Sequence, residues 1–133
     1  MSEILVQWVV VLFQVLIALG LLNVWLVRSG HATKYRGGTA QNMKEEFSTY
    51  GLPTWFMYVV GFLKIVIAGV MIVTLFMPGL MYPLGIGALV LLTILMLGAV
   101  SMHLKVHDPV LKMLPAFSML TMAVVAISLT RLF

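Results

Sequence analysis

The stretch TWFMYVVGFLKIVIAGVMIVTLFM, residues 54–77, decides the fold of this protein. A helix needs about 20 consecutive apolar residues to cross the hydrocarbon core of a bilayer. This stretch reaches that length and carries one charged residue, Lys64. Three further apolar stretches are comparably long and lie at residues 4–27, 83–104 and 113–131. The sequence therefore predicts an all-α integral membrane protein, a four-helix bundle that forms one transmembrane domain over residues 1–133.

The composition agrees with a membrane protein and excludes several function classes. Of the 133 residues, 62% are hydrophobic and 9% are charged, whereas a soluble domain has about 25% charged residues. The chain has no cysteine, which excludes disulfides, thiol nucleophiles and thiolate-bound iron–sulfur clusters. The net charge of +4 lies mostly in the predicted loops. We interpret it as membrane topology and lipid-headgroup contact, and we expect no nucleic-acid partner.

The connections between the spans differ in length. Residues 78–83, PGLMYP, predict a tight turn that makes the second and third spans an antiparallel pair. Residues 28–53 form the longest connection, which is basic and glycine-rich at first and then predicts a short amphipathic interfacial helix at 39–50, capped by Thr39. The alternative is an ordinary surface loop. The helix would bury Met43, Phe47 and Tyr50 and would turn toward water Lys44, Glu45, Glu46 and Ser48.

The number of spans predicts the sidedness of the loops. With four spans, the connections at residues 28–53 and 105–112 lie on one side, and both termini lie on the other. Basic residues concentrate in these two connections. The positive-inside rule then places both basic loops in the cytoplasm and both termini outside. We expect a multi-pass protein of the plasma membrane, specifically the bacterial inner membrane.

Lys64 is the strongest candidate for a functional residue. A lysine in hydrocarbon costs from a few to more than ~10 kcal/mol and by default marks a functional site. All the acidic residues lie outside the spans, although the helix at 39–50 could bring Glu45 or Glu46 to it. Three interpretations stay open: a ligand or anion site, a structural lysine that reaches the interface or pairs within the bundle, and a contact between subunits of a homo-oligomer. Gly61, one turn earlier, would let a helix or a ligand approach closely.

Polar residues of the first span are candidate neighbours of Lys64. Gln7, Gln14 and Arg28 fall on one helical stripe. Because unpaired amides are costly in lipid, we expect this stripe to face the second span and to share a polar pocket with Lys64. The alternative is that the glutamines only join helices by hydrogen bonds.

His103 ends the third span and has its own alternatives. His103 and His107 have a spacing that can bind metal on a helix, but two nitrogens are an incomplete site. Asp108 followed by Pro109 predicts the start of the fourth helix and an earlier end of the third. We therefore predict no metal site. His103 would bond to loop backbone or would line the pocket as a proton donor or acceptor.

Several segments resemble the DoxX-like family of small four-span membrane proteins. They are KYRGG at 34–38, EEF at 45–47, YGLP at 50–53, VGFLK at 60–64, MLGAV at 96–100, His103, and Asp108 with Pro109. The resemblance implies a compact four-helix bundle. Relatives are named as subunits of a thiosulfate:quinone oxidoreductase, as partners of soluble redox enzymes, or as assembly chaperones and cargo receptors. Many relatives carry glutamate near the position of Lys64, so lysine reverses the charge there.

These observations predict a membrane accessory protein whose bundle holds a small amphiphile, a quinone or a lipid, without a covalent cofactor. Lys64 beside Gly61 would bind its anionic or carbonyl oxygen, Gln7 and Gln14 would orient it, and the pocket mouth would be lined by Arg28, Arg36 and His103. One alternative is a subunit of a quinone-linked oxidoreductase in which Lys64 or His103 moves protons and a partner protein supplies electrons. Another is an assembly chaperone or scaffold. The sequence does not identify catalytic residues.

Overall fold

A computed structural model describes residues 2–132, and every regular element in that range is a helix. This confirms the all-α prediction. In chain order the elements are α1 (Glu3–Leu22), the π-helical turn η1 (Asn23–Val27), α2 (Met43–Thr49), α3 (Thr54–Phe76), the 3-10 turn η2 (Pro78–Leu80), the π-helical turn η3 (Met81–Gly85), α4 (Ile86–Lys105) and α5 (Val110–Leu132).

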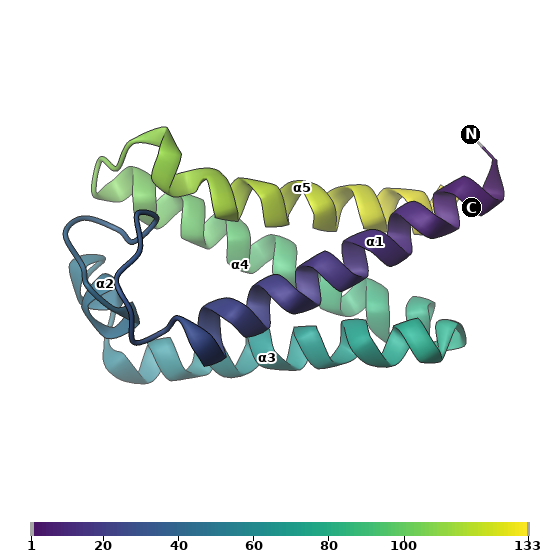
Figure 1. Ribbon diagram of the computed structural model, residues 1–133, viewed down its shortest axis with the longest axis horizontal. Coiled ribbons are helices and arrows are strands. Elements are labelled where there is room, and N and C mark those ends of the chain that lie inside the picture. Colours follow the sequence, from purple (N-terminus) through teal and green to yellow (C-terminus); the bar gives the residue numbers. More distant parts are fainter. Residues whose placement is uncertain (1, 133) are drawn as a thin grey trace.

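Four helical stretches are long and apolar enough to cross a membrane, which confirms the four spans. They are Glu3–Val27, Thr54–Phe76, Pro78–Lys105 and Val110–Arg131. Figure 1 shows the long helices as one elongated bundle, with both termini at one end and α2 with its flanking loops at the other. The two connections that carry the basic residues therefore lie at the same end, as predicted.

The third span begins earlier than residue 83. Pro78 starts η2, and Pro83 lies within η3, a wider turn that continues directly into α4. A proline in a regular helix removes one backbone hydrogen bond and crowds the preceding turn, so a wide turn accommodates it better. The fourth span also begins earlier than predicted, at Val110 immediately after Pro109.

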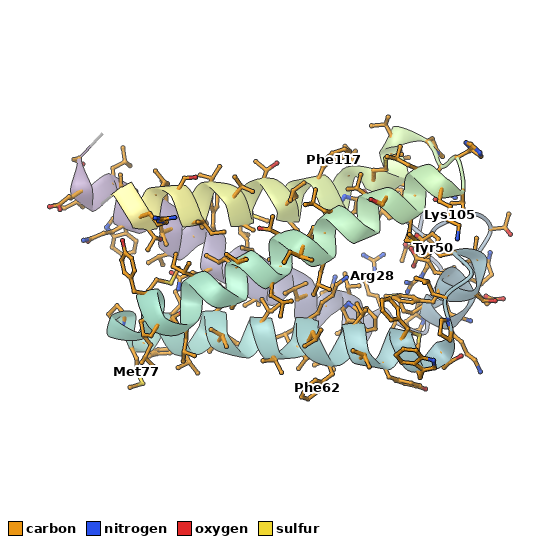
Figure 2. All side chains as sticks on the ribbon, turned by 180° about the vertical axis from the view of Figure 1, so that it is seen from behind. Arg28, Tyr50, Phe62, Met77, Lys105 and Phe117 are labelled. Atoms are coloured by element: carbon orange, nitrogen blue, oxygen red, sulfur yellow. The ribbon has the colours of Figure 1, made fainter. Side chains whose placement is uncertain are left out.

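The spans meet through small and apolar side chains. Ile17, Ile67, Met71, Leu89 and Leu92 are fully buried at the centre. Ala68, Ala123 and Ala126 are also completely buried, and small residues of this kind let membrane helices approach closely. Large apolar side chains cover the outside of the bundle, where lipid tails would contact them; Figure 2 shows Phe62, Met77 and Phe117 pointing outward.

The short helix α2 forms in the predicted connection, but it begins at Met43 and not after Thr39. Asn42 is its cap, because the Asn42 side chain accepts a hydrogen bond of 2.8 Å from the Glu45 backbone N–H. Such a cap satisfies a donor that the helix cannot satisfy itself. Met43 and Phe47 are buried as predicted. Packed against Met57 and Val60 of α3, they place α2 over the loop end of the bundle.

Candidate functional site

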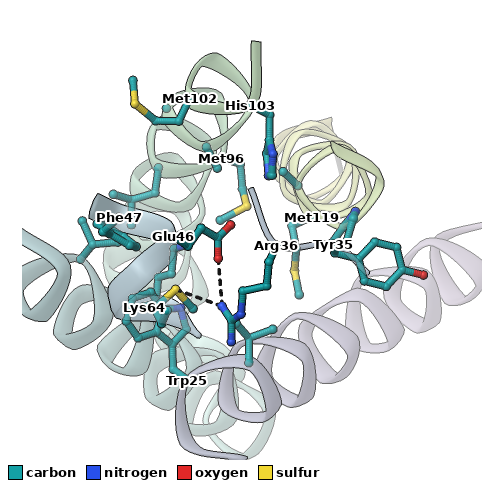
Figure 3. Close-up of a pocket in the computed structure, with 18 of the residues that line it drawn as sticks. Trp25, Tyr35, Arg36, Glu46, Phe47, Lys64, Met96, Met102, His103 and Met119 are labelled. Atoms are coloured by element: carbon teal, nitrogen blue, oxygen red, sulfur yellow. Dashed lines mark hydrogen bonds and ion pairs between the residues drawn. The ribbon is translucent and has the colours of Figure 1, made fainter. Parts of the chain in front are cut away.

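A cavity of about 470 Å³ lies near the loop end of the bundle, among the four long helices and beneath α2. Its volume lies within the range of small-molecule sites in proteins. Of the residues singled out from the sequence, four line it: Arg28, Arg36, Lys64 and His103. Its walls are otherwise mostly apolar and include four methionines: Met43, and Met96, Met102 and Met119, which Figure 3 labels. Methionine side chains adapt to irregular ligand shapes.

Arg36 and Glu46 form a buried ion pair at the cavity wall. Arg36 Nη1 lies 2.9 Å from Glu46 Oε2 (Figure 3), and only 5% of the arginine is exposed. The guanidinium also donates to the backbone carbonyls of Arg28, Ser29 and His31. A buried charge pair is tolerated only when the remaining donors and lone pairs also find partners, and this pair meets that condition.

The prediction that Glu46 faces water is wrong. Besides the bond to Arg36, the Glu46 carboxylate accepts hydrogen bonds from the Gly37 backbone N–H at 3.1 Å and the Tyr50 hydroxyl at 2.8 Å. These contacts offset the loss of hydration that drives an unpaired carboxylate to the surface. Burial, together with the Glu46 carboxylate, raises the pKa of Tyr50 well above its ordinary value, so the phenol stays protonated.

His103 is held by Asp108, and not by loop backbone. His103 Nδ1 lies 2.7 Å from Asp108 Oδ2, and the Tyr50 hydroxyl lies 3.5 Å from the ring nitrogens. The other oxygen, Asp108 Oδ1, accepts from the Gly38 backbone N–H at 3.0 Å and lies 3.9 Å from Lys112 Nζ. Burial alone would raise the pKa of Asp108, but the bonds from His103 and Gly38 and the nearby positive charges outweigh it and lower that pKa.

Further hydrogen bonds join the first connection, residues 28–53, to the third connection, residues 105–112. Lys105 Nζ donates to the Tyr50 backbone carbonyl at 2.8 Å, and Lys112 Nζ donates to the Gly38 carbonyl. Figure 2 shows Lys105 and Tyr50 together at the loop end. With Asp108 and Gly38, these bonds form a roof of polar contacts that closes the end of the bundle. His107 takes no part in it: this exposed residue lies beyond the end of α4, so the two histidines do not share a helix.

Lys64 projects from α3 to a tryptophan on the cavity wall. Its Nζ lies 5.4 Å from the centroid of the Trp25 ring, within the range of a cation–π interaction (Figure 3). No carboxylate among residues 2–132 lies within ion-pair distance of this ammonium group. The indole Nε1 of Trp25 is buried and also lacks a hydrogen-bond partner in that range. Two donors therefore lie side by side with unused capacity.

Local backbone features explain how Trp25 reaches this position. Trp25 lies in η1, where the Arg28 N–H bonds to the Asn23 carbonyl at 2.9 Å and makes the turn wider than an α-helical turn. Such π-helical turns occur often at functional sites. Gly61 does not line the cavity; a Cβ at this position would stand 2.6 Å from two carbons of the indole ring. The predicted close approach at Gly61 is thus made by Trp25.

The structure does not bring the two glutamines to Lys64. Gln14 Nε2 donates to Thr74 Oγ1 at 2.8 Å, and Thr74 lies ten residues from Lys64, about 15 Å along α3. Gln7 is exposed and lies still nearer the end that carries the termini. The single predicted pocket is therefore corrected to two separate polar groups. Gln14 joins α1 to α3, which agrees with the alternative interpretation of the glutamines.

Sequence reasoning missed four members of the cavity region as site residues: Trp25, Glu46, Tyr50 and Asp108. Two of them carried a usable signal. Trp25 lies on the same helical stripe as Gln14 and Arg28, and Glu46 lies beside the apolar Phe47 within α2. Tyr50 and Asp108 meet His103 only through folding, since they come from the two separate connections.

Comparison with known proteins identifies the family. A family model described as the DoxX-like family matches residues 17–127. That range contains every residue that lines the cavity. Neither the curated proteins nor the solved structures include a match to this chain.

Proposed function

We propose that this chain, which belongs to the DoxX-like family, is a multi-pass membrane protein that binds one small amphiphile, a quinone or a lipid, in the cavity beside Lys64. One observation carries the proposal: Lys64 lines the cavity without an ion pair or hydrogen bond to residues 2–132, and the indole N–H of the adjacent Trp25 is buried without a partner in the same range. A desolvated donor without a partner is costly, and a ligand oxygen would relieve that cost.

The rest of the cavity suits the apolar part of such a molecule. Below the polar roof, its walls consist of aliphatic and methionine side chains from all four spans, including Leu21, Val60, Leu95, Met96 and Met119. The polar end of the ligand would lie near Lys64, and the apolar end would follow these side chains. Arg28, Arg36 and His103 complete the polar end in this proposal, whereas the glutamines take no part.

A second candidate rests on the His103–Asp108 pair. Because Asp108 holds Nδ1, the other nitrogen of His103, which lies 3.5 Å from the Tyr50 hydroxyl, would be the one to exchange a proton. This is the arrangement expected of a subunit in a quinone-linked oxidoreductase whose electrons come from a partner protein. A third candidate, an assembly chaperone or scaffold, would act through the outer helix faces.

The proposal includes an orientation. The loop end would face the cytoplasm, because the basic residues gather there, and the termini would lie outside the plasma membrane. The chain has no cysteine, so single cysteines at Ser2 and at Lys44 allow a clean labelling experiment. A membrane-impermeant thiol reagent applied to intact cells should label the cysteine at position 2 and spare the one at position 44. The reverse pattern contradicts the orientation.

Two glycines provide a matched test of the cavity. Gly98 lines the cavity, Gly69 does not, and a Cβ added at either one meets no atom within 4 Å. We expect mass spectrometry of the purified protein to find one amphiphile in the wild type and in Gly69→Phe, and to find it strongly depleted in Gly98→Phe. Equal occupancy in all three proteins would place the ligand elsewhere. An empty wild type that copurifies with another protein would favour the scaffold.

Redox assays separate the first two candidates. A quinone in the cavity, together with a quinone-reducing activity that disappears in His103→Ala, would favour the oxidoreductase subunit. A bound amphiphile without any turnover favours the binding protein.

A further inference from the structure

We infer that the polar end of the bound amphiphile is a carboxylate on an aliphatic chain, as in a free fatty acid, and that Lys64 pairs with it. The inference rests on the proposed function and narrows it from any amphiphile to an anionic one with a single tail. Its basis is the charge balance of the cavity, the unused hydrogen-bond donors and the shape of the apolar space.

The cavity contains more positive charge than its carboxylates neutralise. Four cations line it, namely Arg28, Arg36, Lys64 and Lys112. Two carboxylates are near: Glu46 on the wall and Asp108 behind His103. Arg36 pairs with Glu46, and Lys112 lies close to Asp108. Lys64 and Arg28 are left over, and Lys64 is the one within the spans, where an uncompensated charge is most costly.

Glu46 attracts Lys64 from a distance but forms no ion pair or hydrogen bond with it, and its oxygens are already used. Oε2 holds Arg36, and Oε1 accepts from both Gly37 and Tyr50. A neutral quinone carbonyl would give Lys64 a hydrogen bond and no countercharge. A carboxylate supplies the countercharge and has a second oxygen with free lone pairs for the Trp25 indole N–H. Because the indole N–H is buried in the ligand-free structure, a small rotation of the Trp25 ring would bring it to that oxygen.

A second apolar hollow lies on the other side of Ile94 from the main cavity. Ile94 lines the main cavity and also a second hollow of about 170 Å³ between α4 and α5. The second hollow is otherwise lined by Val90, Thr93, Val124, Ile127 and Ser128. A linear tail that starts near Lys64 would reach this second hollow if the Ile94 side chain turned aside. The main cavity, about 470 Å³, suits one chain better than a glycerophosphate head with two chains.

The test uses the fluorescence of Trp25 to report ligand binding. The chain has three tryptophans, and Trp8 and Trp55 are mostly exposed. In a Trp8→Phe, Trp55→Phe background, Trp25 emission can follow titration of detergent-solubilised, delipidated protein with palmitate. Three control ligands are titrated in the same way. Methyl palmitate and menaquinone are uncharged, and dipalmitoyl phosphatidylglycerol carries an anionic phosphate in place of a carboxylate. We expect palmitate to bind at least tenfold more tightly than each of the other three.

Substitutions at Lys64 complete the test. Lys64→Met should weaken palmitate binding about 10- to 100-fold, as expected when a charged hydrogen bond is lost, and Lys64→Arg should retain most of it. If Lys64→Met fails to fold, the comparison of palmitate with its methyl ester in the wild type still decides whether binding requires a carboxylate. If methyl palmitate or menaquinone binds as tightly as palmitate, the requirement for a carboxylate is contradicted, whereas the proposed function is not. Displacement of palmitate by phosphatidylglycerol would also contradict that requirement. If none of the four binds, the proposed function fails too.

Discussion

Two polar pairs join the same two spans and differ in one respect. Gln14 of α1 meets Thr74 of α3 in one half of the bundle, and Trp25 of η1 meets Lys64 of α3 in the other. The first pair is closed: the amide donates to the hydroxyl, and the hydroxyl donates to the α3 backbone. The second pair leaves an ammonium group and an indole N–H without acceptors, beside a cavity. Unused hydrogen-bonding capacity, more than polarity itself, distinguishes a candidate site from a structural contact in a membrane bundle.

The largest expected effect concerns the roof above the open pair. Glu46→Ala removes the partner of buried Arg36, and breaking a buried ion pair in this way costs about 3–5 kcal/mol. The control is Lys44→Ala on the exposed side of the same helix, where we expect a change within about 0.5 kcal/mol. Unfolding in a denaturing detergent gradient measures both. Equal effects would mean that the roof does not depend on the ion pair.

The next prediction tests the packing of the Trp25 ring against Gly61. Gly61→Leu puts a side chain where the indole ring lies, and overpacking of this kind costs about 1–3 kcal/mol. Amphiphile occupancy should fall as well, because Trp25 must move. Gly69→Leu, on the same helix with open space around it, is the control and should leave both stability and occupancy unchanged. A normal occupancy in Gly61→Leu would remove Trp25 from the binding site.

The two polar pairs themselves should respond in opposite directions. Gln14→Leu should lower the unfolding free energy by about 0.6–2 kcal/mol, the range of hydrogen bonds between membrane helices. Lys64→Met should leave the ligand-free protein equally stable or more stable, because it removes an uncompensated charge and keeps an unbranched side chain. Detergent unfolding of delipidated protein measures both variants. A clear loss of stability in Lys64→Met would show that Lys64 is structural.

The smallest effect is a pH dependence of the contact between the connections. The folded state lowers the pKa of Asp108 below its ordinary 3.8. The carboxylate therefore contributes stability that is complete above that value and is lost as the pH falls through the lower pKa of the folded protein. Asp108→Asn should remove this acid-side dependence, which unfolding curves between neutral pH and pH 3 would record. An unchanged curve in Asp108→Asn would assign the acid sensitivity to other groups.

Hydropathy sufficed to predict the four spans, the shared end of the two basic loops and the position of Lys64 inside a span. The buried face of α2 also followed from the spacing of Met43 and Phe47. These features depend on local pattern, because the bilayer length and the helical period apply to each segment separately. The same pattern failed at Glu46, since no local rule shows that Arg36 lies where it can neutralise a carboxylate.

Two other features depend on geometry that a regular helical wheel omits. The wide turn η1 changes the direction of Trp25 relative to the rest of the first span. The level at which Gln14 meets α3 depends on how two helices slide along each other, and sequence spacing within one helix does not contain that information. The predicted shared pocket failed for this second reason.

The roof has a consequence for how the cavity would be filled. The first connection is held by hydrogen bonds with three residues near the end of α4 and the start of α5: Lys105, Asp108 and Lys112. A molecule that entered from water at this end would therefore have to break several hydrogen bonds at once. The side facing Ile94 requires only apolar side chains to shift. Exchange would then proceed sideways, by diffusion within one leaflet, and its rate would follow membrane fluidity more closely than the aqueous concentration of the ligand.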